Sequence, residues 1–100
     1  MNSKQFDEVL NFRLEQIKLI LQQKALEYAS AEGDRLHNFN KAATFTGTTR
    51  EKALWGMAMK HLISVTDLID TWENNGQLPS EYLVNEKIGD LINYLILLEA

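Results

Sequence analysis

The fold is decided by one stretch of sequence, EKIGDLINYL at residues 86–95. Glu86, Asp90 and Asn93 are spaced by four and three residues, which places their side chains on one side of a predicted helix. Almost every other residue of this helix is apolar, and a helix that is apolar nearly all round is buried on more than one side. Carboxylates in such a helix need partners, either cations of the protein or a metal ion. We therefore predict that this helix packs between others and that its acidic groups bind a ligand.

The apolar residues of this helix also predict how the chain assembles. Five of them form a core stripe, and three lie outside that stripe: Val84, Ile88, Leu91, Leu95 and Leu98 in the stripe, and Ile92, Ile96 and Leu97 outside it. In a monomer of three helices the second group would leave a large apolar patch exposed, and such patches mark interaction sites. We therefore expect a homo-oligomer, either a dimer or a tetramer.

Three long helices account for most of the sequence, at about residues 3–28, 49–74 and 80–99. Ser3 is the expected N-cap of the first helix, residues 48–51 have the spacing of a capping box, and Pro79-Ser80 starts the third helix. The second helix has a predicted core stripe of its own: Leu54, Ala58, Leu62, Val65, Ile69 and Trp72. No stretch alternates with period two for long enough to predict a strand. We expect a single all-α domain over residues 1–100.

The link at about residues 29–47 is long for a helical bundle, in which two to eight residues are usual. Leu36 and Phe39 fit one face of a short helix that would end near Phe45. Two interpretations stay open for this segment. Its apolar residues, Leu36, Phe39 and Phe45, plug one end of the bundle, or its polar residues bind a ligand.

Composition limits the partners that we expect. The 100 residues carry ten basic and fourteen acidic side chains, mixed along the chain, and no basic block that would follow a nucleic-acid backbone. We therefore expect no duplex nucleic acid as a partner. Cysteine is absent, which is compatible with a reducing cytoplasm. Since no apolar run approaches the roughly 20 residues needed to cross a bilayer, we expect a cytoplasmic protein with no membrane partner.

Several residue types near the helix ends suit a phosphorylated ligand. Mg²⁺ prefers carboxylate oxygens, and Glu86 and Asp90, one helical turn apart, could share one ion; alternatively, Glu86 pairs with solvent or a neighbouring lysine. Lys60 could hold phosphate, although its stem could equally lie along the surface with the ammonium in water. Lys24 and Arg35 could donate to phosphates.

A family resemblance rests on these residues. Residues 86–92 resemble the Glu-Glu-Leu-Gly-Asp-Leu-Leu segment of MazG-like all-α nucleoside triphosphate pyrophosphohydrolases. Further segments are similar to small phage proteins on the border of that superfamily: Lys24 through Tyr28, Arg35, Asn38, Phe39, Ala53-Leu54-Trp55-Gly56 and Lys60-His61. The resemblance covers about residues 20–100. It implies an antiparallel helical bundle, dimeric or larger, that binds a nucleotide.

The resemblance also implies roles for individual residues. Expected to contact the nucleotide are Lys24, Tyr28, Arg35, Asn38, Phe39, Lys60 and His61. Expected to hold Mg²⁺ are Glu27, Glu86 and Asp90. In active members the ion activates water for attack between the α and β phosphates, giving a monophosphate and pyrophosphate. The family motif has a Glu three residues before the Asp, where this chain has Lys87.

Two functions therefore stand as hypotheses. In the first, the chain is a phage-type MazG-like nucleotide-binding protein, in the host cytoplasm if phage-encoded, and turnover of (deoxy)nucleoside triphosphates is left open. In the second, it is a non-catalytic helical interaction or regulatory protein that acts on a host or defence factor, and its carboxylates are structural.

Overall fold

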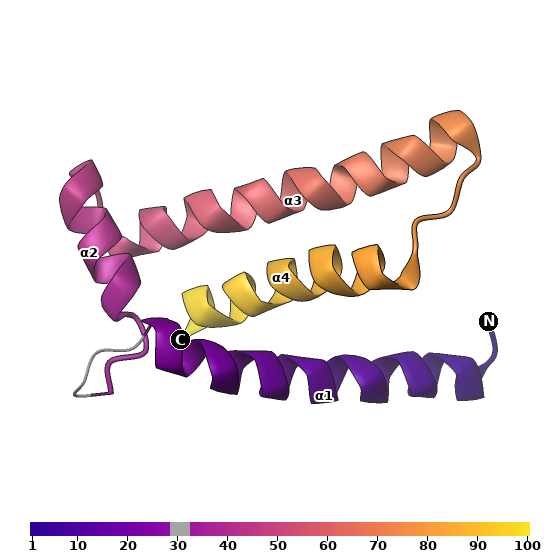
Figure 1. The fold of residues 1–100 in the computed structure, drawn as a ribbon, viewed down its shortest axis with the longest axis horizontal. Helices are drawn as coiled ribbons and strands as arrows, with labels where there is room; N and C mark the ends of the chain where they lie inside the picture. Colours follow the sequence, from indigo (N-terminus) through magenta and orange to yellow (C-terminus); the bar gives the residue numbers. More distant parts are fainter. Residues whose placement is uncertain (29–32) are drawn as a thin grey trace.

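Four helices make up the structure, which is a computed structural model: α1 (Ser3–Tyr28), α2 (His37–Thr46), α3 (Arg50–Asn75) and α4 (Glu81–Glu99) (Figure 1). The structure describes residues 1–28 and 33–100, without the side chains of residues 26–28. Within these residues every regular element is a helix, which confirms the all-α prediction. No helix of this part of the chain combines the length and the apolarity that crossing a membrane requires.

Polar side chains and glycines set the helix ends. Asn2, rather than Ser3, caps α1, because its Oδ1 accepts from the Gln5 backbone N–H at 2.8 Å while the Gln5 side chain accepts from the Asn2 N–H at 2.9 Å. Thr49 caps α3 by accepting from the backbone of residue 52, and Ser80 caps α4 as predicted. Gly76 ends α3 with φ 65°, a left-handed conformation that glycine adopts without strain.

The helix α4 lies between α1 and α3 (Figure 1). Consecutive long helices alternate in direction, so α3 and α4 form an antiparallel pair, as expected for this type of bundle. Because α4 inserts between α1 and α3, however, its other neighbour α1 runs parallel to it. The prediction that this helix has partners on two sides is confirmed.

The core is concentrated at the end of the bundle that α2 crosses. Phe39 of α2, Leu54 and Ala58 of α3 and Tyr94 of α4 form one buried cluster, with Leu36 packed against it. The Phe39 and Tyr94 rings meet edge to face at 6.1 Å. Leu36 and Phe39 therefore do plug this end. Phe45 does not, because it is 88% exposed.

The buried face of α4 differs from the predicted stripe. Leu91 and Leu98 of that stripe pack against the core cluster, but Ile88 and Leu95 are exposed, whereas Gly89, Asn93 and Tyr94 are buried. The expected exposed patch outside the stripe is absent from this part of α4, because its three residues are half-buried: Ile92, Ile96 and Leu97. Tyr94 is buried against α2 and α3, and Gly89 lies at the contact with α1. The Arg13 guanidinium occupies the place of a side chain at Gly89, where a Cβ atom would be 2.6 Å from Nη1. Since glycine carries no apolar signal, periodicity alone could not identify this face.

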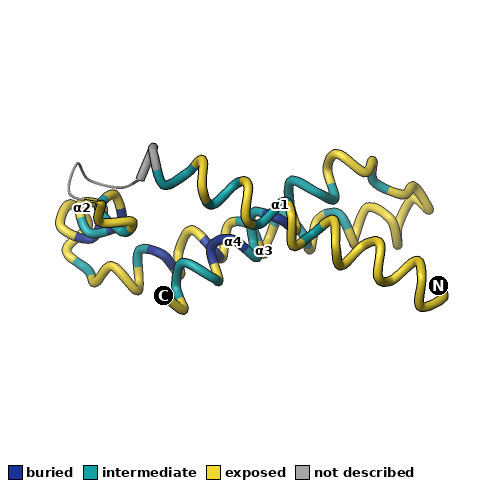
Figure 2. The backbone as a smooth tube through the Cα atoms, turned by 90° about the horizontal axis from the view of Figure 1, so that it is seen from below, coloured by how far each residue is buried: buried dark blue, intermediate teal, exposed yellow. Residues whose placement is uncertain are grey.

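Exposed residues dominate the rest of the molecule (Figure 2). On α3 the predicted core stripe is buried only at its start, at Leu54 and Ala58. Further along, Leu62, Ile69 and Trp72 are about half exposed, so the prediction for this part of the stripe is wrong. Within this chain, α3 is buried near α2, and much of the rest of the helix is exposed.

Candidate functional site

A histidine and an aspartate join α3 to α4 next to the core. The Nδ1 atom of His61 lies 3.7 Å from Oδ2 of Asp90, which is within ion-pair range but longer than a hydrogen bond. Each side chain is about one quarter exposed, 25% for His61 and 28% for Asp90. The antiparallel packing of α3 and α4 brings together two predicted site residues that lie 29 positions apart in the sequence.

Tyr94 completes this arrangement. Its ring stacks on the His61 imidazole, with 4.8 Å between centroids and 19° between the planes. Because Tyr94 follows Asp90 by one helical turn, the same face of α4 supplies a carboxylate to one edge of the imidazole and an aromatic ring to one of its faces. The sequence interpretation did not include Tyr94 among the site residues. Its position four residues after Asp90 was the available signal.

Asn93 is the second notable residue of this part of α4. Its side chain is 3% exposed, and neither its Nδ2 nor its Oδ1 atom has a hydrogen-bond partner among the described residues. Asn85, two turns earlier, has a buried Oδ1 in the same condition. An unpartnered buried amide costs about 1–3 kcal/mol, and such groups are few in native proteins. Asn93 therefore needs a partner that this chain does not supply within the described residues.

The predicted magnesium ligands are not gathered into one cluster. Glu86 lies 3.5 Å from the Lys87 ammonium, as in the alternative that a neighbouring lysine neutralises it, and Asp90 faces His61. The Glu27 side chain is outside the described residues. Across the described part of the chain, no three His, Asp or Glu side chains come close enough to hold a metal ion together. These residues do not fit an ion held by the protein alone.

The predicted nucleotide contacts lie at the same end of the bundle but do not converge on one point. Arg35 donates to the Leu21 carbonyl oxygen at 2.9 Å, which ties the segment before α2 to α1. Lys60 and Asn38 are exposed, Lys24 is half-buried, and Phe39 belongs to the core. The Tyr28 side chain lies outside the described residues. Of the predicted nucleotide contacts, His61 and Phe39 lie near each other, because both contact Tyr94.

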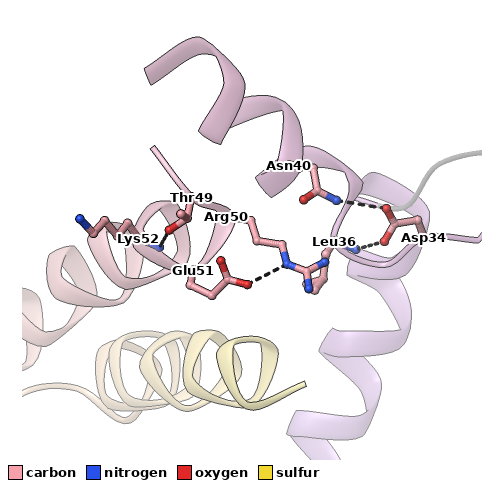
Figure 3. A network of polar contacts seen from close by, with 7 residues as sticks. All are labelled: Asp34, Leu36, Asn40, Thr49, Arg50, Glu51 and Lys52. Carbon is pink, nitrogen blue, oxygen red and sulfur yellow. Dashed lines mark hydrogen bonds and ion pairs between the residues drawn. The ribbon is translucent and has the colours of Figure 1, made fainter. Parts of the chain in front are cut away.

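A polar network orders the segment that leads into α2 (Figure 3). Asp34 accepts from the Leu36 backbone N–H at 3.0 Å and from the Asn40 amide at 3.3 Å. Nearby, Arg50 and Glu51 pair at 2.9 Å at the start of α3. The Arg50 hydrogen bond lowers the pKa of the Glu51 carboxyl. The two hydrogen bonds of Asp34 hold the segment at the start of α2, and α2 in turn carries Phe39 onto Tyr94.

The site can therefore offer a ligand three kinds of group. The partly exposed His61 imidazole, with its Nδ1 3.7 Å from the Asp90 carboxylate, can take part in hydrogen bonding or proton transfer. The His61 ring is the partly exposed member of the stack with Tyr94, which is itself buried in the core, and Lys60, the residue before His61, is exposed. Comparison of the chain with protein-family models, curated proteins and solved structures gives no match.

Proposed function

We propose that this chain is a nucleotide-binding protein of the MazG-like type that works as a homo-oligomer in the cytoplasm. The observation that carries the proposal is the His61–Asp90 pair stacked on Tyr94, partly open to solvent, on the helix turn that also bears Asn93. Aromatic rings bind nucleobases by stacking, and amides pair with their polar edges. Lys60, the residue before His61, would supply a cation for phosphate.

Magnesium enters this proposal with the nucleotide. Mg²⁺ is commonly bound through one or two carboxylates together with the phosphates of a substrate, rather than by a cage of protein ligands. In this proposal Asp90 would be the carboxylate that holds the ion, and Glu86 lies one turn before it on α4. We therefore expect no stabilisation of the protein by Mg²⁺ alone.

Thermal unfolding of the full chain with nucleotides tests the proposal. The panel contains ribo- and deoxynucleoside mono- and triphosphates, each with and without Mg²⁺. A ligand at a hundredfold excess over its Kd stabilises the folded state by about 2.7 kcal/mol. For a domain of this size, that corresponds to a rise in Tm of about 10 °C or more. A flat response across the whole panel would overturn the proposal.

Matched variants locate the binding site. His61→Ala and Asp90→Asn should each remove the nucleotide-dependent rise in Tm. The controls are His37→Ala and Asp67→Asn, which change the same residue types on α2 and on the exposed surface of α3 and should keep the rise. Equal losses in all four variants would show that the site lies elsewhere.

Hydrolysis is a separate extension of the proposal. With Mg²⁺ or Mn²⁺ present, release of pyrophosphate from any triphosphate of the panel would establish it. In this extension the His61 imidazole, 3.7 Å from Asp90, would accept a proton from water. If no nucleotide releases pyrophosphate, the catalytic extension fails and the binding proposal stands on the thermal shifts.

A second candidate function rests on a different observation. Large apolar side chains lie exposed on α1, α3 and the connection to α4, among them Phe6, Trp55, Trp72 and Leu78. Such a surface favours the alternative that the chain is a non-catalytic interaction protein, which regulates a host or defence factor. This alternative would be supported if no nucleotide of the panel raises the Tm and the chain itself stays monomeric.

A further inference from the structure

The helix α3 carries a second apolar stripe on its outer side. Trp55, Met59, Leu62 and Ile69 are each between 44% and 50% exposed, and Thr66 fills the remaining position. The spacing of four, three, four and three residues is that of the seam of a coiled coil. This stripe lies beside the buried residues of α3, and each of its apolar side chains is about half exposed.

The surface area of the chain fits a missing second copy. A folded monomer of 11.5 kDa exposes about 5,800 Å² by the usual scaling with mass. This chain exposes 7429 Å², an excess of about 1,600 Å². Stable homodimers bury about 1,000–2,500 Å² per subunit. The radius of gyration, 15.8 Å against about 13 Å for a compact chain of 100 residues, describes the same open shape.

Charges along α3 favour one orientation of the two copies. The first half of the helix has three basic residues and one acidic residue, and the second half has three acidic residues: Arg50, Lys52 and Lys60 with Glu51, then Asp67, Asp70 and Glu73. Two copies of α3 side by side in antiparallel order would place the basic half of each against the acidic half of the other. Parallel order would place like charges together, which is unfavourable. The helix dipoles favour the antiparallel order as well.

We propose that two copies of this chain pair through the outer stripe of α3, antiparallel, about a twofold axis at Leu62. In a twofold interface a residue on the axis meets its own counterpart, so Leu62 lies against Leu62 of the partner subunit. Trp55 then lies against Ile69 of the partner subunit. This inference names the interface of the homo-oligomer contained in the proposed function.

A groove next to Ile69 gives this pairing an anchor. It has a volume of about 270 Å³, lies between α3 and α4, and is lined by apolar residues that include Val65, Leu68, Ile69, Trp72 and Val84. In the proposed pairing, the Trp55 indole reaches the mouth of this groove on the partner. A tryptophan in an apolar pocket is a frequent source of binding energy at interfaces.

Single cysteines test the pairing directly, because the chain has none of its own. Under mild oxidation, L62C should form a disulfide-linked dimer, since a disulfide requires Cα atoms within about 7 Å. The matched control is I63C, the next residue, which is also apolar and exposed but lies about 100° further around the helix. A mixture of W55C and I69C chains should form crosslinked heterodimers. Equal crosslinking of L62C and I63C, or none in any of these variants, would overturn the proposed pairing.

Sedimentation separates this inference from the proposed function. The unmodified chain should be dimeric or larger at micromolar concentration, L62K should be monomeric with its helical circular dichroism retained, and I63K should assemble like the unmodified chain. A monomeric unmodified chain would overturn assembly as a whole. Assembly that survives L62K would overturn this interface alone. The nucleotide thermal shifts report on ligand binding independently of both results.

Discussion

The two ends of α3 differ in what covers them. At its start, near α2, Leu54 is 2% exposed within a cluster that three helices build together. Towards its end, Ile69 and Trp72 are about half exposed, although both are large apolar residues. The difference shows that an apolar composition predicts that a helix is buried, but not whether its own chain or another chain covers it. The first end is covered by this chain, and the second is the part that the proposed pairing of two copies would cover.

Substitution in the closed region should have the largest effect on stability. Leu54→Ala removes a fully buried side chain and should lower the free energy of unfolding by about 2–4 kcal/mol. Ile63→Ala, on an exposed part of the same helix outside the proposed interface, should change it by about 0.5 kcal/mol or less. Urea denaturation of both variants at one protein concentration measures the contrast. Similar losses for the two would mean that the two regions do not differ as described.

Asn93→Leu should have the opposite sign. The substitution replaces an unpartnered buried amide by an apolar group of similar shape and removes a desolvation cost of about 1–3 kcal/mol. We expect the free energy of unfolding to rise by up to that amount while the nucleotide-dependent rise in Tm is lost. Asn75→Leu, at the exposed end of α3, is a control that should leave both measurements nearly unchanged. Destabilisation by Asn93→Leu would show that the amide has a partner in the folded protein.

A smaller effect is expected where α1 meets α4. Alanine in a helix interior is favoured over glycine by about 1 kcal/mol, but a Cβ atom at position 89 would displace the Arg13 guanidinium. Gly89→Ala should therefore stabilise the protein by less than about 1 kcal/mol, and by the full amount when Arg13→Ala is also present. The double-mutant cycle measures this coupling from urea denaturation. Additive effects would mean that Arg13 does not lie over Gly89.

The smallest effect is expected at the exposed pair of Arg50 and Glu51. Because the Arg50 hydrogen bond lowers the pKa of the Glu51 carboxyl, the pair stabilises the folded state above the ordinary carboxyl pKa. That contribution is lost as the pH falls through the lowered pKa of the folded state. NMR titration of the Glu51 carboxyl should show this pKa rise in Arg50→Gln. If the pKa of Glu51 is unchanged in Arg50→Gln, the Arg50 hydrogen bond is not what lowers it.

The sequence predicted the helices well, because their ends depend on local signals. Ser80 and Gly76 mark helix ends by their own hydrogen-bonding and backbone properties, and the structure confirms both. The cap of α1 was placed one residue late, since asparagine and serine are both good caps. The short helix within residues 29–47 was predicted as an alternative and is present as α2.

The arrangement of side chains between helices was much harder to predict. The pairing of His61 with Asp90 depends on the register of α3 against α4, and no local pattern fixes that register. The buried face of α4 was assigned to a stripe that includes Ile88 and Leu95, because the analysis of spacing counted only apolar residues. The real contact with α1 uses Gly89 and Arg13, a glycine and a cation that such an analysis scores as exposed.

The central position of α4 has a consequence for synthesis of the protein. The ribosome produces α1 and α3 before α4, so the helix that joins them is the last of the three to be made. Arg13 meets residues 85 and 89 only after more than seventy further residues have been translated. Until then, the nascent chain displays apolar helices with nothing between them, which is the kind of surface that chaperones bind. Cotranslational folding of this chain is thus delayed until its last helix emerges.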